Sequence, residues 1–233
     1  GGSYTVATSV QAVRAAAQAL DLDLGRATVA VVGASGAVGS VSARLLAREC
    51  ARLVLVGLPR HADRLQAIRA EIEGEGGART WTSADPAAVR EADVVVTVTS
   101  SVTPVIEPAH LRSGAIVLDV ARPRNVSREV DQVRDDVLVI EGGMVAVPGP
   151  ELDFGFDFGF PPRMAFACMA EVMILALEGR MESYSLGRKI DVDRVLEIEA
   201  LGAKHGFRLG GFRSFERAVT QDEIERVRRA IKR

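Results

Sequence analysis

The chain has 233 residues, 48% of them hydrophobic and 26% charged, which are the proportions of an ordinary soluble globular protein. Its 29 basic and 31 acidic side chains leave a net charge of −2, so no basic field points to a nucleic acid or a membrane surface as partner. The two cysteines, Cys50 and Cys168, are too few for a disulfide framework and fit a reducing, cytoplasmic location, and no apolar run is long enough for an integral membrane segment.

The first predicted element is a helix that precedes the first strand. Ser3 and Thr5 are helix-capping residue types ahead of residues 6–20, whose apolar side chains recur at helical spacing. Because the chain begins with glycine rather than methionine, we expect that an N-terminal part of the protein precedes it.

A run of mostly β-branched residues at 29–32 leads into the sequence GASGAVG, and a helix-like segment follows. This pattern predicts a buried parallel strand that turns tightly into a helix and seats a phosphate there. Gly33 would permit the bend, Gly36 would let backbone amides approach a pyrophosphate, and Gly39 would let helix and strand pack closely. The spacing differs from G-x-G-x-x-G, so a glycine-rich turn without a ligand is the alternative, but the position between strand and helix favours a dinucleotide. The predicted phosphate-binding residues are Gly33, Ser35, Gly36, Ala37, Val38 and Gly39.

Strands and helices continue to alternate along the first two thirds of the chain. Further strands are expected at 53–56, 80–82, 92–98, 115–119 and 137–140, and a helix at 62–72. The alternation predicts an α/β fold, a doubly wound, mostly parallel sheet (a Rossmann fold) with flanking N-terminal and C-terminal helices. Right-handed crossovers then place the carboxyl ends of the strands at one edge, where ligands bind.

Beyond the sixth predicted strand the pattern changes. The loop DFGFDFGF at 153–160 carries four of the eight phenylalanines, and two prolines then open a predicted helix at 163–177 that is apolar on nearly all faces and therefore expected to be buried. Further helices are expected at 191–205 and, with a charged surface, at 221–233. The predicted domain limits are 1–24 for a linking helix, 25–160 for an NADP-binding domain, and 161–233 for C-terminal helices that pack on it and on a substrate lobe outside this chain.

The end of the second predicted strand decides which nucleotide is expected. In doubly wound folds an acid here accepts a hydrogen bond from the adenosine ribose, but this strand is followed by GLPRH, which contains Arg60 and no acid. A guanidinium favours a 2′-phosphate, so NADPH is the expected cofactor. Two alternatives stay open: Arg60 is a solvated loop residue, or Asp63 lies nearer the ribose.

Polar residues also follow the fourth and fifth predicted strands. Thr99 and Ser100 come after the fourth strand and would lie near the nicotinamide, although a polar loop without a ligand explains them equally well. Asp119 ends the fifth strand ahead of the sequence VARPRN, and it could cap the cofactor site or only its own turn. These three residues complete the predicted cofactor-binding set.

Cys168 lies in the apolar segment MAFACMAE at 164–171. From the residues alone, a cysteine on an apolar helix is foremost a packing residue, and a nucleophile would need thiolate character that its sequence neighbours do little to provide. Glu171, one turn further on, could relay a proton or only satisfy a polar neighbour. Cys50 ends a predicted helix and is expected to be structural. The three histidines show no metal-ligand spacing, so no metal site is predicted.

Several short strings, taken together, carry a resemblance to a known family. They are GGSYT at 1–5, GASGAVG at 33–39, the loop 119–125, GGMV at 142–145, FAC at 166–168 with Glu171, and KHGF at 204–207. In this order they resemble the long-chain acyl-(acyl-carrier-protein) reductases that form fatty aldehydes, relatives of the nucleotide-binding domains of shikimate dehydrogenase and glutamyl-tRNA reductase. The resemblance extends from residue 1 to about residue 207.

The resemblance implies a reaction in two steps. Cys168 stands at the position of that family's nucleophile, which would take the acyl group from an acyl-carrier-protein thioester before NADPH delivers hydride and an aldehyde leaves. Ser3, Tyr4 and the thiol would meet at a cleft, and we expect backbone amides at the start of the first helix to hold the thioester oxygen. The implied substrate partner is acyl-carrier protein, and the resemblance leaves room for a homo-oligomer.

Two other interpretations are kept. One is an NADP-dependent alcohol or ketone dehydrogenase of the shikimate dehydrogenase type, which would not need Cys168. The other is a dinucleotide-binding module without catalysis.

Overall fold

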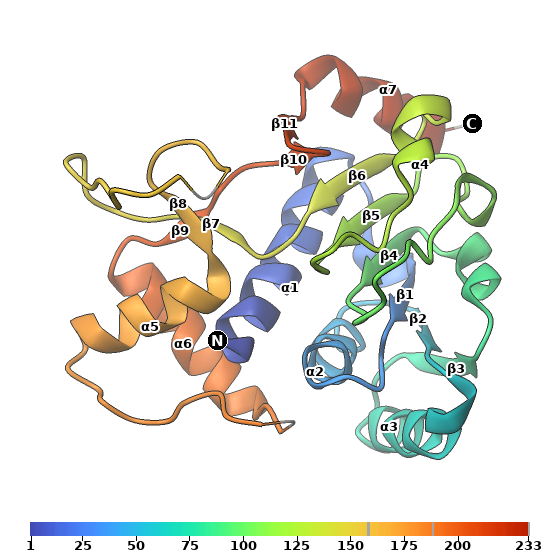
Figure 1. The fold of residues 1–233 in the computed structure, drawn as a ribbon. Coiled ribbons are helices and arrows are strands. Elements are labelled where there is room, and N and C mark those ends of the chain that lie inside the picture. The colour runs from blue at the N-terminus through green and yellow to red at the C-terminus, as the bar shows by residue number, and fades with distance from the viewer. Residues whose placement is uncertain (158, 188, 233) are drawn as a thin grey trace.

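The computed structural model describes residues 1–157, 159–187 and 189–232. At its centre is a parallel six-stranded sheet in the order β3-β2-β1-β4-β5-β6 (Figure 1). The strands are β1 (Thr28–Val32), β2 (Arg52–Val56), β3 (Arg79–Ser83), β4 (Val94–Thr97), β5 (Ile116–Asp119) and β6 (Leu138–Glu141). This is the strand order of doubly wound dinucleotide-binding folds, so the predicted fold class is confirmed.

Strands β1, β4, β5 and β6 are buried along their whole length because both faces of the sheet are covered. One core cluster joins one face to the long helices, and a second, smaller cluster joins the other face to α4 and short 3-10 turns. The helices of the first face are α1 (Gly2–Ala19), α2 (Ala37–Leu46), α3 (Ala62–Gly74) and α7 (Gln221–Ile231). The second face carries α4 (Arg128–Val133) and the 3-10 turns Pro86–Glu91 and Pro108–His110.

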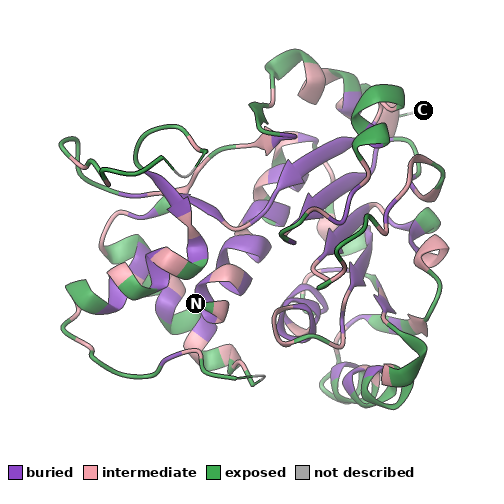
Figure 2. Ribbon diagram, in the orientation of Figure 1, coloured by how far each residue is buried: buried purple, intermediate pink, exposed green. Residues whose placement is uncertain are grey.

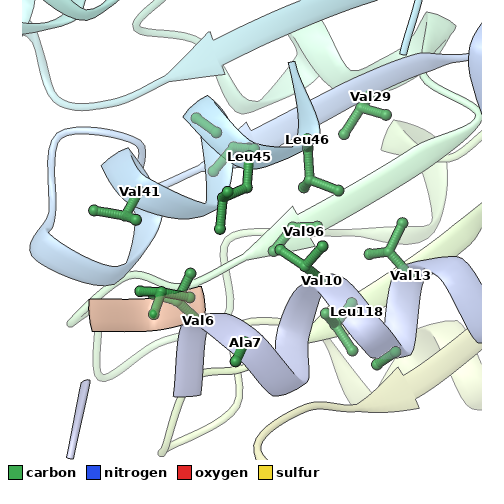
Figure 3. Packing of buried hydrophobic residues seen from close by; sticks show 14 of the residues in the cluster. Val6, Ala7, Val10, Val13, Val29, Val41, Leu45, Leu46, Val96 and Leu118 are labelled. Atoms are coloured by element: carbon green, nitrogen blue, oxygen red, sulfur yellow. The ribbon is translucent and has the colours of Figure 1, made fainter. Parts of the chain in front are cut away.

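Helix α1 lies between the sheet and a second unit of the molecule (Figure 1). Its small and β-branched residues allow close packing, and Figure 3 shows Val6, Val10 and Val13 within the cluster that also contains side chains of α2, β4 and β5. On its opposite side α1 contacts α5 (Ala167–Leu177) and α6 (Val192–Lys204). The helix is therefore buried on almost every side (Figure 2).

The second unit contains a small antiparallel sheet in the order β8-β7-β9, next to α5 and α6. Its strands are β7 (Met144–Ala146), β8 (Met164–Phe166) and β9 (Arg208–Leu209). A hairpin of β10 (Arg213–Ser214) and β11 (Arg217–Ala218) then contacts β6 before α7 begins. This unit starts at β7, which pairs with β8 and β9 and not with the central sheet, so it begins before the predicted limit at residue 160. No helix among the described residues is long and apolar enough to span a membrane.

Three sequence expectations differ from the structure. The predicted helix at 163–177 begins only at Ala167, because residues 164–166 pair with β7 as a strand. Helix α5 is also not buried all round, since Cys168 is exposed and Val172 is 65% exposed. Ser3 and Thr5 lie inside α1, and the side chains that accept from its first turn are those of Glu171 in α5 and of Ser185. Phe158 of the phenylalanine-rich loop and Arg233 of the last predicted helix lie outside the described residues.

Candidate functional site

A cavity of about 770 Å³ opens at the carboxyl ends of β1, β2 and β4. Its wall is formed by the glycine turn, the loop after β2 and the loop after β4. This is the edge at which ligands bind in doubly wound sheets, and the volume is in the range of small-molecule and cofactor sites. Seven of the predicted cofactor-binding residues line it, namely Gly33, Ser35, Gly36, Ala37, Arg60, Thr99 and Ser100.

The glycines of the turn are fixed by close backbone contacts. Gly33 has a φ of +89°, and a Cβ there would lie 2.5 Å from the carbonyl oxygen of Val98. A Cβ on Gly39 would lie 2.3 Å from the carbonyl oxygen of Gly33, so α2 can approach β1 only without a side chain at this position. Gly36 is the N-cap of α2, whose first amides have no acceptor within the helix. The turn therefore fits a pyrophosphate, as the sequence predicts, with Val38 and Gly39 in the first turn of the helix rather than on the cavity wall.

The end of the cavity next to β2 is basic. Arg60, His61 and Arg64 line it, and the described residues that line the cavity include no carboxylate. Asp63 is not among them, so the interpretation that brought it nearer the ribose is not supported. The sequence did not lead us to predict His61 and Arg64 as residues of the site. Arg64 could have been found, because it follows Arg60 by one turn at the start of a helix, whereas the position of His61 depends on a contact with the glycine turn.

The opposite end of the cavity is shaped by the loop after β4. The Asn125 Oδ1 atom accepts hydrogen bonds from the Thr97 hydroxyl at 2.9 Å and from the Thr99 amide at 2.8 Å. Asn125 is in turn held by Asp119, whose carboxylate accepts from the amides of Ala121, Asn125 and Val126. Burial raises the pKa of the Asp119 carboxyl, and these three amide donors oppose that shift. Asp119 thus orders its own loop and does not line the cavity, which is the second of the two roles considered for it.

Cys168 is the second residue of α5, and its side chain is exposed rather than buried. A Cβ on Gly1 would lie 2.4 Å from the Cα atom of Cys168, and a Cβ on Gly2 would lie 3.9 Å from the Cγ2 atom of Val38. Gly1 therefore lies against Cys168, and α1 also packs on α2, the helix that follows the glycine turn. Cys168 is accessible, and it is not among the residues that line the cavity.

The Ser3 and Tyr4 amides at the start of α1 are already bonded, which corrects the role expected for them. Glu171 is only 2% exposed; its Oε2 atom accepts from the Tyr4 amide at 2.9 Å, and its Oε1 atom lies 3.3 Å from the Gly1 nitrogen. The Ser3 amide donates to the Ser185 hydroxyl at 3.0 Å, and that hydroxyl donates to the Ser3 oxygen. These amides are therefore not free to hold a thioester oxygen.

The Tyr4 side chain is buried against α6, so it is not placed to hold a thioester oxygen either. It is 2% exposed and lies so close to α6 that a Cβ on Gly202 would be 2.7 Å from the tyrosine oxygen. Burial raises the pKa of Tyr4 to about 12, so its hydroxyl stays protonated at neutral pH. Within the described part of the chain, helix amides without an acceptor occur instead at the start of α5. Ala167 donates to the Gly143 carbonyl, but the amides of Cys168 and Met169 have no acceptor within the helix.

The two cysteines are expected to react very differently with a small alkylating reagent. Burial raises the pKa of Cys50 to about 11, so only about one Cys50 in a thousand is a thiolate at pH 8, and the group is also covered. Exposed Cys168 should therefore be alkylated in the native protein while Cys50 stays unmodified, as peptide mass spectrometry can show. Equal labelling in urea is the control, and native modification of Cys50 first would contradict the structure.

The sequence predicts no metal site. Among the described residues, no group of three or more histidine, cysteine or acidic side chains could hold a metal ion.

Comparison with known proteins places this geometry in a family. Residues 14–141, more than half of the chain, match the family model described as Shikimate / quinate 5-dehydrogenase. A long-chain acyl-[acyl-carrier-protein] reductase of Synechococcus elongatus is 33% identical over 217 residues, which are 89% of this chain and 60% of that protein. A Serratia sp. protein named aminotransferase PigE is 29% identical over 98% of this chain but only 27% of its own length. The chain thus spans less than two thirds of either relative.

Among solved structures, that of a dipicolinate synthase component from Bacillus halodurans aligns with 60% of this chain and 47% of its own, at 23% identity and a TM-score of 0.49. The strand order of the central sheet and the glycine turn establish the doubly wound fold. With the family model matched over the sheet and its turn, the chain belongs to the shikimate / quinate 5-dehydrogenase family.

Proposed function

We propose that this protein uses NADPH to reduce a long-chain acyl thioester, carried by acyl-carrier protein, to a fatty aldehyde through an acyl-enzyme on Cys168. The observation that carries the proposal is the position of Cys168. Cys168 is exposed at the amino end of α5 and lies against Gly1 at the start of α1, the helix that also packs on α2. The likeness over 89% of this chain to a reductase of such thioesters supports the same reaction.

The cavity fits a dinucleotide by its own residues. The turn leaves no room for a Cβ on Gly33 or Gly39, and the basic end offers Arg60 to a 2′-phosphate. The first amides of α2 would hold the pyrophosphate, and the loop containing Thr99 and Ser100 would bound the nicotinamide end. When bound, NADPH supplies the hydride that turns the enzyme-held acyl group into an aldehyde and returns Cys168 as a thiolate.

The residues of this chain account for the transfer step. The Cys168 sulfur forms a bond to the acyl carbonyl carbon, the bond from that carbon to the carrier's sulfur breaks, and the carrier leaves as a thiol with the proton that Cys168 lost. Negative charge on the carbonyl oxygen would be met by the unbonded amides of Cys168 and Met169, at the positive end of the α5 dipole. Because one thioester replaces another, the exchange needs little driving force.

The acyl-enzyme can be tested directly. Incubation with a long-chain acyl-carrier-protein thioester, without NADPH, is expected to raise the intact mass by one acyl group, and peptide mapping should place the gain on Cys168. Addition of NADPH should remove it and release the aldehyde. Buried Cys50 is the internal control. Acylation elsewhere, or none in a protein that binds NADPH, would refute the proposal.

The family match also favours a second candidate. It covers the sheet at 14–141 and does not include Cys168, so an NADP-dependent dehydrogenase of the shikimate dehydrogenase type would use the same cavity without the thiol. Alcohol or ketone turnover that survives the loss of Cys168 would select this function.

A further inference from the structure

We propose that Asn125 is a positioning residue for hydride transfer: it fastens both ends of the loop 99–105 and so sets where the nicotinamide ring lies against the substrate. This inference rests on the proposed function, because it assumes that a nicotinamide cofactor in the cavity donates hydride. It goes further by giving a role in the reaction to a buried side chain that does not itself line the cavity.

The loop 99–105 follows β4 and forms one end of the cavity wall. Thr99 at its start and Val105 at its end both line the cavity. A Cβ on Gly33 would lie 3.1 Å from the Cγ2 atom of Thr99, so the loop begins in contact with the glycine turn. Because the pyrophosphate would lie at that turn, with the adenosine toward β2, this loop bounds the end of the cavity left for the nicotinamide.

Asn125 holds the two ends of the loop with two different groups. Its Oδ1 atom accepts from the Thr99 amide at 2.8 Å, and its backbone carbonyl accepts from the amides of Val105 at 2.7 Å and Ile106 at 3.0 Å. Asn125 is itself fixed, because its own amide donates to the Asp119 carboxylate at 3.0 Å. The end of β5 therefore supports the loop after β4 through a single residue.

The hydrogen bonds of the Asn125 side chain are one-sided. The residue is fully buried, and its Nδ2 atom has no hydrogen-bond partner within the described part of the chain. A buried donor without a partner is unfavourable, so the Oδ1 atom, which also accepts from the Thr97 hydroxyl, accounts for an amide at this position. Its bonds fix the direction in which the chain leaves β4. Hydride transfer needs closely aligned atoms, so a small shift of this loop is enough to slow it.

A single turnover separates positioning from binding. The acyl-enzyme is formed first, confirmed by intact mass and then mixed with NADPH, whose oxidation is followed by stopped-flow absorbance. Asn125→Ala should slow the oxidation roughly ten- to a hundredfold. The dissociation constant for NADPH, measured by fluorescence titration, should change less than about threefold, because the phosphate sites are unaltered. Asn125→Asp keeps the Oδ1 acceptor and should transfer hydride at least about fivefold faster than Asn125→Ala.

Two milder variants form a matched pair. Thr97→Val keeps the shape of its side chain, removes one of the two bonds to the Asn125 Oδ1 atom, and should slow hydride transfer roughly two- to fivefold without weakening NADPH binding. Thr80→Val removes an equally buried hydroxyl from β3, where it donates to the Ala78 carbonyl, and should leave the transfer rate unchanged.

The outcomes distinguish this inference from the proposed function. An unaltered protein that forms no acyl-enzyme, or whose acyl-enzyme does not oxidise NADPH, would overturn both. If the unaltered protein reacts, a normal rate in Asn125→Ala or an equal loss of rate and NADPH affinity would overturn only the positioning role. An Asn125→Asp rate no higher than that of Asn125→Ala would overturn it too, and so would equal rates in Thr97→Val and Thr80→Val.

Discussion

Cys168→Ser is expected to abolish both the acyl-enzyme and aldehyde formation, lowering the rate by roughly a thousandfold or more. A serine hydroxyl fills nearly the same space as the thiol but is a far weaker nucleophile at neutral pH unless a general base activates it. Glu171 cannot serve as that base, since its carboxylate already accepts from the start of α1. NADPH affinity and the free energy of unfolding should stay unchanged, since the side chain is exposed.

The measurements are NADPH oxidation with an acyl-carrier-protein thioester, intact mass without NADPH, and NADPH titration of the same variant. Cys50→Ala is the matched control: it removes the other thiol from a buried position and should retain acylation and turnover. Aldehyde formation by Cys168→Ser at an undiminished rate would exclude the covalent route and favour direct hydride transfer, as in the second candidate function.

Gly39→Ala is expected to destabilise the protein by about 1–3 kcal/mol and to reduce dinucleotide affinity severely. The new Cβ would lie 2.3 Å from the Gly33 carbonyl oxygen and 2.9 Å from its carbon, both of them backbone atoms that cannot rotate away. Helix α2 must therefore move off β1, and its first amides move with it. Urea unfolding and NADPH titration measure the two effects.

Gly74→Ala provides the comparison on another helix of the same sheet. A Cβ at the end of α3 meets nothing within 4 Å, so this change should leave NADPH binding intact and alter the free energy of unfolding by no more than about 1 kcal/mol, toward greater stability. Wild-type affinity in a folded Gly39→Ala protein would mean that the close contact of helix and strand is not what positions the phosphate site.

The sheet and its phosphate turn could be predicted from the sequence because both have local causes. Strands such as β4 and β5 are buried on both faces, so they are short, continuous apolar runs with polar loops and turns between them. The positive φ of Gly33 and the tight contact at Gly39 require glycine at those positions, which the sequence displays directly.

The surroundings of Cys168 could not be predicted, because they depend on partners far away in the chain. Strand β8 is three apolar residues that read equally well as helix until β7 pairs with them. Glu171 binds the Tyr4 amide across 167 positions, so the sequence does not reveal that this amide is occupied. His61 likewise needs Ser35, 26 positions earlier, to be brought to the cavity wall.

The placement of α1 has a consequence for how the molecule holds together. Among the residues of α1, only Arg14 and Gln18 are exposed, and the helix packs against both the parallel sheet and the β7 unit. Helix α1 therefore supplies part of the hydrophobic core of both units. Helix α2, which follows the glycine turn of the cavity, and helix α5, which carries Cys168, both pack against α1. A substitution that loosens α1 is therefore expected to disturb the nucleotide cavity and the surroundings of the thiol together.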